Sequence, residues 1–207
     1  MIARPFLLVL SLFLFSCVNS QENPSARLVG GPCEGCEAIF DYGQQKLNSI
    51  DTLPGFESAV NKLKVSGTIY KSDGKTPAPN IILYLYQTNA EGLYAPAKGA
   101  EGWARRHGKI RGWLKTGADG KYAFYTHIPG NYPGSEFAAH IHPTILEPDG
   151  KYYYIQDYLF ENDPYVEQGL RENPRGGTDG VLRLKKENGI LVGKRDLILS
   201  KNISPYN

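Results

Sequence analysis

Histidine is scarce in this chain, which has only four among its 207 residues, and neither sign of charge dominates. The formal net charge is +2, so the sequence offers no electrostatic attraction to nucleic acid or to an anionic membrane surface. No internal repeat is visible, and no long apolar helix is indicated after residue 64. The hydrophobic content of 41% is ordinary for a globular protein, and the length suits one domain with a real core.

The first 17 residues predict an export signal. Arg4 forms a short basic region, and the apolar run 6–15 is too short to span a bilayer. Residues 14–17, Leu-Phe-Ser-Cys, resemble a bacterial lipobox, in which Cys17 becomes the lipidated first residue of the mature chain. The alternative is an ordinary cleaved signal with an incidental cysteine. We therefore expect an exported protein, periplasmic or held at a membrane surface as a bacterial lipoprotein by a lipid anchor at Cys17.

The two remaining cysteines, Cys33 and Cys36, are three positions apart. An oxidising compartment favours a small-loop disulfide between them, and a redox-active dithiol is the alternative for this spacing. A zinc knuckle needs further thiols or nearby histidines, which are missing. A c-type haem site needs histidine at position 37, where the sequence has Glu37.

The composition divides the chain into four segments. The export signal 1–17 precedes a polar tether with the cysteine pair, 18–36. An N-terminal extension, 37–63, follows and includes a short helix expected around 55–62. The main domain is expected to span 64–200, where strand patterns and tight turns begin.

The main domain reads as strands joined by glycine-containing turns. The stretches 109–128, 137–160 and 181–200 each predict a hairpin, around Gly-Ala-Asp-Gly, Pro-Asp-Gly and Glu-Asn-Gly respectively. This spacing predicts an all-β fold, an antiparallel β-sandwich with long functional loops. Two irregular stretches, 88–108 and 129–136, are where functional residues are expected, because loops on a rigid scaffold commonly carry function.

His140 and His142 stand two apart in an otherwise apolar run, residues 137–145. Alternate residues of a strand point to one face, so both imidazoles are expected on the same side. The pair is either two ordinary strand histidines or two metal ligands that need partners elsewhere in the chain. His107 and His127 are expected to be solvated. No third histidine or acidic residue has the spacing of a zinc hydrolase motif.

Four stretches together resemble the intradiol ring-cleavage dioxygenases, non-haem iron(III) enzymes typified by catechol and protocatechuate dioxygenases. They are 65–94, 111–133, 138–145 and 154–164. The resemblance extends from about Lys64 to about Leu199 and implies a β-sandwich-like catalytic core, in agreement with the strand pattern.

The resemblance also implies a set of site residues. In that family one tyrosine closes an Asn-Ala-x-Gly-x-Tyr turn, a second follows Pro-Gly-x, and a His-x-His strand comes next. The matching positions are Tyr94, Tyr132, His140 and His142, which would bind iron(III). The family's glutamine on the following strand falls on Gln156, which would be a donor near the substrate or oxygen atoms.

These residue types suit iron(III) for a physical reason. The ion is a hard Lewis acid that prefers anionic oxygen, and it must drive deprotonation of phenols whose ordinary pKa is about 10. Two tyrosinates and one hydroxide balance its charge, which suits a buried centre. By resemblance, a catechol would displace hydroxide and Tyr132, each departing base would take a substrate proton, and O₂ would open the ring between the two hydroxyl-bearing carbons.

The sequence departs from the family pattern at one informative position. Phe137 stands where the classical enzymes carry an arginine, and the segment between Tyr132 and His140 is shorter than in those enzymes. The missing cation weakens charge stabilisation in the transition state. The alternative function is a non-catalytic, prealbumin-like cell-surface binding module, because the strand–turn–strand stretch 67–87 suits such a module equally well.

Overall fold

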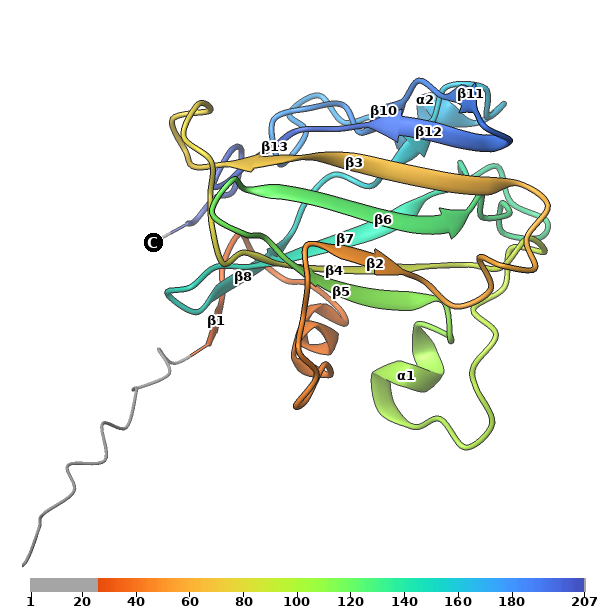
Figure 1. Ribbon diagram of the computed structural model, residues 1–207, viewed down its shortest axis with the longest axis horizontal. Coiled ribbons are helices and arrows are strands. Elements are labelled where there is room, and N and C mark those ends of the chain that lie inside the picture. The colour runs from red at the N-terminus through yellow and green to blue at the C-terminus, as the bar shows by residue number, and fades with distance from the viewer. Residues whose placement is uncertain (1–25, 207) are drawn as a thin grey trace, which may run out of the picture.

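The computed structural model describes residues 26–206, in which two β-sheets pack face to face (Figure 1). The expectation of an all-β sandwich is therefore confirmed, but both large sheets also contain parallel strand pairs and are mixed, not purely antiparallel. Within this range no helix has the length and apolar character needed to cross a bilayer. The predicted export signal and Cys17 lie outside the described residues.

One sheet has five strands in the order β1-β8-β7-β4-β5. In chain order they are β1 (Arg27–Leu28), β4 (Ile82–Gln87), β5 (Arg111–Lys115), β7 (Ile141–Leu146) and β8 (Lys151–Tyr154). Its three inner pairings, β4 with β5, β4 with β7 and β7 with β8, are antiparallel, whereas β1 joins β8 in parallel at the edge.

The second sheet has six strands, in the order β11-β12-β3-β6-β2 with β13 beside β3. They are β2 (Ile50–Thr52), β3 (Lys62–Tyr70), β6 (Lys121–His127), β11 (Lys185–Glu187), β12 (Ile190–Lys194) and β13 (Leu197–Ile198). A short third sheet pairs β9 (Leu159–Phe160) with β10 (Val181–Leu182). The described helices are short: η1 (Cys36–Phe40), α1 (Gly102–Arg106) and α2 (Val166–Gly169).

Two of the three expected hairpins are confirmed. β7 pairs with β8 and β11 pairs with β12, both antiparallel. The expected hairpin over 109–128 is wrong, because β5 lies in the five-stranded sheet and β6 in the six-stranded one. The Gly-Ala-Asp-Gly turn therefore carries the chain across the sandwich from one sheet to the other.

The core lies between the two sheets. Leu83, Ile141 and Ile145 from the five-stranded sheet meet Leu63 and Phe124 from the six-stranded sheet, and all five are buried. Since side chains alternate along a strand, inward-facing Ile141 leaves its neighbours on the outer face of the five-stranded sheet. This outer face is the one that bears the histidine pair.

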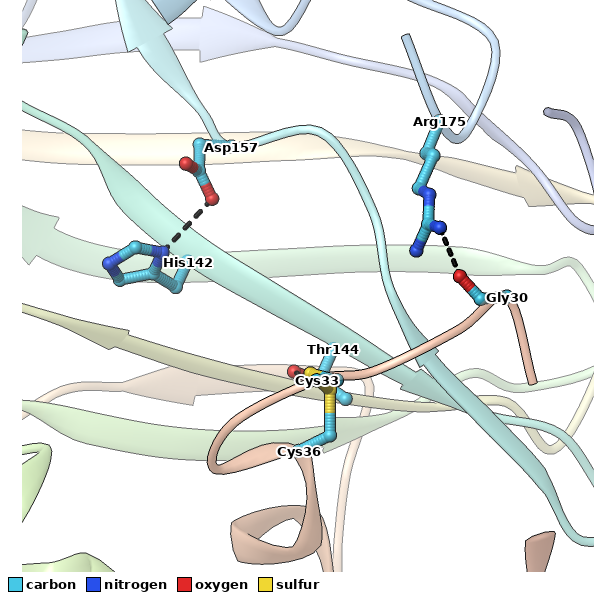
Figure 2. Close-up of a disulfide and its surroundings, with 7 residues drawn as sticks. All are labelled: Gly30, Cys33, Cys36, His142, Thr144, Asp157 and Arg175. Atoms are coloured by element: carbon cyan, nitrogen blue, oxygen red, sulfur yellow. Dashed lines mark hydrogen bonds and ion pairs between the residues drawn. A yellow bond between two sulfur atoms is a disulfide. The ribbon is translucent and has the colours of Figure 1, made fainter. Parts of the chain in front are cut away.

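The N-terminal segments pack onto this scaffold. Cys33 and Cys36 form a disulfide (Figure 2). The η1 helix beside them buries Ala38 and Ile39 against the outer face of the five-stranded sheet. The short helix expected around 55–62 is wrong: turns and a bend occupy this stretch, and β3 begins at Lys62. Only six residues, 56–61, separate Gly55 from β3, and so short a segment forms a helix only where tertiary packing supports it.

Candidate metal centre

Strand β7 presents His140 and His142 on one side, as the alternation predicts. His142 lies within the strand and His140 immediately precedes it, and their Nε2 atoms are 3.0 Å apart. Ile141, between them, is fully buried in the core. The two imidazoles meet edge to face with ring centroids 4.4 Å apart.

Two loops bring a tyrosine each to this pair. The first loop turns at Asn89, whose side-chain Oδ1 accepts the backbone N–H of Leu93 at 2.8 Å, and it delivers Tyr94. The second loop follows β6 and delivers Tyr132. The loops are joined by a backbone bond from the Gly130 N–H to the Asn89 carbonyl, 2.8 Å long.

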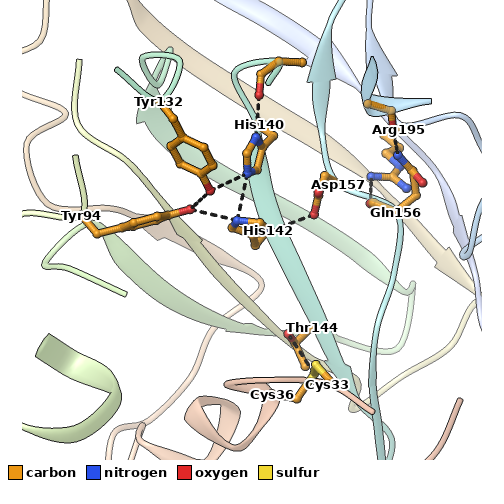
Figure 3. A network of polar contacts seen from close by, with 12 residues as sticks. Cys33, Cys36, Tyr94, Tyr132, His140, His142, Thr144, Gln156, Asp157 and Arg195 are labelled. Carbon is orange, nitrogen blue, oxygen red and sulfur yellow. Dashed lines mark hydrogen bonds and ion pairs between the residues drawn. A yellow bond between two sulfur atoms is a disulfide. The ribbon is translucent and has the colours of Figure 1, made fainter. Parts of the chain in front are cut away.

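The four side chains converge in a closed ring of short contacts (Figure 3). The Tyr94 hydroxyl is 2.7 Å from the Tyr132 hydroxyl and 2.9 Å from Nε2 of His142. The Tyr132 hydroxyl is 3.0 Å from Nε2 of His140. With the Nε2–Nε2 distance of 3.0 Å, two oxygens and two nitrogens thus form a quadrilateral from residues up to 48 positions apart.

The far nitrogen of each imidazole is already engaged. Nδ1 of His140 is 2.6 Å from the Ala138 carbonyl, and Nδ1 of His142 is 3.0 Å from a carboxylate oxygen of Asp157. Both acceptors require a proton on Nδ1, which leaves each neutral imidazole with its Nε2 lone pair directed at the quadrilateral.

A proton count shows that this arrangement suits a cation. With both Nε2 atoms unprotonated, the four atoms share only the two phenol protons, and two of the four contacts are left between acceptors. First-row metals bond to nitrogen and oxygen at about 2 Å, which places neighbouring ligand atoms about 3 Å apart. The contacts of 2.7 to 3.0 Å have this spacing. Two phenols with two imidazoles therefore fit a metal that accepts hard oxygen donors.

Burial keeps these groups uncharged when no metal is bound. It raises the pKa of Tyr94 far above its ordinary value, and the neighbouring Tyr132 adds to the increase. Burial also raises the pKa of Tyr132 and, together with the adjacent His142, lowers the pKa of His140. Both phenols are therefore protonated at neutral pH until a cation displaces their protons.

Asp157 is the member of the site that sequence reasoning missed. It forms a potential metal-holding group with His140 and His142, with one donor atom of each within 4.8 Å of the others. Burial acts to raise the pKa of Asp157, but the hydrogen bond from His142 and the electrostatic effects of His142, His140 and Arg195 together outweigh it, and the net shift is downward. Asp157 lies 15 residues after His142 in the sequence. The sequence does not show the pairing between chain segments that brings its carboxylate to the imidazole.

Asp163 holds the second loop in place. One of its carboxylate oxygens accepts the Asn131 side-chain amide at 2.8 Å and the Ala139 backbone N–H at 3.0 Å. Asn131 immediately precedes Tyr132 and Ala139 immediately precedes His140, so Asp163 links the chain at these two site residues. The sequence stretch Glu-Asn-Asp-Pro that contains Asp163 gave no indication of this role.

An aromatic stack packs against the ring of His142. Tyr86, opposite His142 in the β4–β7 register, stacks on that imidazole at 4.5 Å and on His107 at 3.8 Å. His107 is buried, and its Nδ1 is 2.9 Å from the Tyr84 hydroxyl. The expectation that His107 and His127 are solvated is wrong for both. His127 is also buried, with Nδ1 3.0 Å from the Ile128 carbonyl.

The structure does not bring Gln156 into the quadrilateral. Its side-chain amide donates to the Gly169 carbonyl at 2.8 Å, and its backbone carbonyl accepts the Arg195 guanidinium at 2.7 Å (Figure 3). The next residue, Asp157, is the one that faces His142, with its Oδ1 3.0 Å from Nδ1 of the imidazole. Phe137, at the position of the family's arginine, is 60% exposed, and its ring packs edge to face with Tyr132.

A cavity of about 280 Å³ opens beside His142. The disulfide loop 32–36 forms one wall, and the rest of the lining consists of Tyr86, His142, Pro143, Thr144, Tyr154 and Asp157. Figure 2 shows the disulfide below His142 and Asp157, with Cys36 against Thr144. Gly35, in the left-handed conformation, lies directly over His107, where a β-carbon would collide with the imidazole.

Comparison with known proteins finds no family model that matches the chain. A curated relative, catechol 1,2-dioxygenase 1 of Acinetobacter lwoffii, is 32% identical over 111 residues, which make up 54% of this chain and 33% of that protein. The match thus spans about a third of the relative's length.

Solved structures share the fold. The dioxygenase domain of a dioxygenase and carbohydrate-binding protein fusion from Streptomyces sp. SirexAA-E superposes with a TM-score of 0.57 at 22% identity, covering 76% of this chain and 92% of that one. Catechol 1,2-dioxygenase from Acinetobacter sp. ADP1 gives a TM-score of 0.58 at 19% identity, covering 77% of this chain and 59% of that one. The chain therefore has the β-sandwich fold of the intradiol dioxygenases, and the resemblance drawn from its motifs is confirmed at the level of the fold.

Proposed function

We propose that this protein is an iron(III)-dependent intradiol dioxygenase that cleaves a catechol-type diol between its two hydroxyl-bearing carbons with O₂. The observation that carries the proposal is the quadrilateral of two phenol oxygens and two imidazole nitrogens, with contacts of 2.7 to 3.0 Å. A binding module has no need to align four such donors from three separate segments.

In this proposal each residue has a defined task. Tyr94, His140 and His142 would hold iron, which would supply the Lewis acidity that activates a diol substrate toward O₂. Tyr132 yields its position to the substrate, and its phenolate oxygen accepts one substrate hydroxyl proton. Tyr132 is only partly buried, and Pro133 and Gly134, which follow it in the loop between β6 and β7, are exposed.

The surroundings support a small aromatic substrate. The cavity of about 280 Å³ beside His142 has aromatic walls from Tyr86 and Tyr154. Flat aromatic walls favour a planar ring through stacked or edge contacts. Of the four quadrilateral residues only His142 lines this cavity, together with Asp157, so the cavity borders the centre on the Nδ1 side of that imidazole. Gln156, whose amide is bonded to Gly169, would have to exchange that partner before it could contact the substrate.

Iron loading of the purified protein tests the centre. We expect a red-brown colour from tyrosinate-to-iron(III) charge transfer and the release of the two phenol protons on binding. Tyr94→Phe and Tyr132→Phe should each weaken the colour. Tyr125→Phe, on β6 of the other sheet, removes a tyrosine away from the site and should leave it unchanged. A colourless protein with full ferric occupancy would exclude the proposed ligand set.

Oxygen uptake with a panel of catechols tests the reaction itself. Uptake with a ring-opened diacid as product supports the proposal. Coloured, iron-loaded protein with no uptake across the panel would overturn the enzymatic function and favour the alternative, a non-catalytic binding module of the cell surface.

We further propose that the protein is exported and anchored by a lipid at Cys17. The Cys33–Cys36 disulfide supports this, since disulfides persist in oxidising compartments. Expression with radiolabelled fatty acid in a bacterial host should label the wild type, and Cys17→Ser should abolish the label. An unlabelled wild type would exclude the anchor.

A further inference from the structure

The two histidines of the quadrilateral differ in the partner behind them. His140 directs its Nδ1 at a neutral backbone carbonyl, that of Ala138, at 2.6 Å. His142 directs its Nδ1 at the Oδ1 atom of Asp157, at 3.0 Å. Figure 3 shows Asp157 on the far side of the His142 ring from the two tyrosines. One imidazole therefore has an anion behind it and the other does not.

The fold fixes Asp157 in this place through its neighbours. Ile155 donates its backbone N–H to the Pro143 carbonyl at 3.2 Å, and Tyr158 and Ile141 exchange two backbone hydrogen bonds of 3.0 Å. These bonds tie the Asp157 segment to β7 on both sides of His142. The backbone pairing of the two segments therefore places the Asp157 carboxylate next to the His142 imidazole.

The alternative role for Asp157 is that of a direct metal ligand, since its carboxylate lies near both histidines. Its contact argues against this role. The bond to Nδ1 places the carboxylate behind the ring, whereas the quadrilateral is formed by Nε2. In metal sites of proteins, such a carboxylate behind a histidine orients the ring, fixes its tautomer and raises its donor strength.

We propose that Asp157 is a positioning residue, which holds His142 with its proton on Nδ1 and places a negative charge behind that imidazole, so that the site binds iron(III) more tightly and favours it over iron(II). The part of this inference that concerns iron rests on the proposed function. The part that concerns the His142 tautomer rests only on the hydrogen bond to Asp157. An anion near the centre stabilises the ion of higher charge more strongly.

Asp157→Asn is the sharpest test, because it keeps the shape and the acceptor oxygen but removes the charge. We expect a fold unchanged by circular dichroism, ferric affinity about 10- to 100-fold weaker, a charge-transfer band at longer wavelength and a higher ferric/ferrous potential. Asp119→Asn removes an equivalent charge from the exposed β5–β6 turn and should change none of these.

The histidine tautomer provides a second measurement that needs neither iron nor activity. In metal-free wild type, ¹⁵N resonances of the His142 ring should report a proton on Nδ1, and Asp157→Ala should give a mixture of tautomers. A wild-type proton on Nε2 would overturn the inference even if the variants failed to fold. So would an Asp157→Asn protein with wild-type affinity, band and potential. A wild type that forms no coloured ferric centre would instead refute the proposed function.

Discussion

At the scale of the residue, His107 shows how burial sets charge beside the candidate centre. Its imidazole lies between the rings of Tyr86 and Trp103, and its Nδ1 is 2.9 Å from the Tyr84 hydroxyl. Burial, with the nearby His142 as a smaller cause, lowers the pKa of His107 to about 4. A neutral His107 can accept the Tyr84 proton at Nδ1, which keeps that buried hydroxyl satisfied.

The lowered pKa of His107 predicts a specific loss of stability in acid. In the unfolded chain this histidine takes up a proton near pH 6.5, whereas in the folded protein it does so only near pH 4. Its contribution to the free energy of unfolding is therefore complete above pH 6.5 and is lost as the pH falls toward 4. The slope is at most about 1.4 kcal/mol per pH unit, the value for one proton.

Urea unfolding of the wild type and of His107→Gln between pH 4 and pH 7 measures this slope. The glutamine variant keeps a polar partner for Tyr84 but does not titrate, so its stability should fall less steeply with acid than that of the wild type. Parallel pH dependences for the two proteins would contradict the prediction.

At the scale of the element, the candidate centre depends on two loops that approach each other at glycines. A β-carbon on Gly92 would collide with the Asn131 carbonyl, and one on Gly130 would collide with the Ala90 carbonyl. Gly92 also has a φ of 77°, in the region that disfavours other residues. The close approach of the loops sets the 2.7 Å separation of the two tyrosine hydroxyls.

Gly130→Ala is therefore expected to separate the loops. Because the added methyl group meets backbone atoms, which cannot rotate away, we expect a loss of about 1–3 kcal/mol in the free energy of unfolding. We also expect a weaker tyrosinate-to-iron(III) band. Gly117→Ala is the matched control, since Gly117 has ordinary backbone angles and its nearest neighbour would be 3.7 Å away. Its effect should be near zero, and an equal effect of both substitutions would refute the steric explanation.

Short sequence patterns predicted those elements whose structure depends on neighbouring residues alone. The shared face of His140 and His142 follows from the two-residue period of a strand, and the hairpins at 144–154 and 185–194 follow from their turns. The stretch 109–128 has the same turn chemistry, yet its strands separate into different sheets. Asp157 and Asp163 act through contacts set by sheet register and loop packing, which no short sequence window contains.

At the scale of the whole molecule, the sandwich interior supports the outer face that carries the site. The core side of β7 is fixed by Ile141 and Ile145, both buried against the second sheet. The opposite side of the same strand carries His142. Because the interior is close-packed, a change in core packing is transmitted between the two sheets. We therefore expect the position of β7 to depend on the packing of both sheets.

Leu83→Ala tests whether the two sheets share one core. Leu83 is fully buried in β4, at the contact between the sheets, so its truncation should lower the free energy of unfolding by about 2–5 kcal/mol. Ile50→Ala, in β2 and 59% exposed, should change it by no more than about 0.5 kcal/mol. Chemical denaturation followed by circular dichroism measures both. A loss below about 1 kcal/mol for Leu83→Ala would mean that the sheets do not depend on this contact, and the rigid support attributed to β7 would lose its basis.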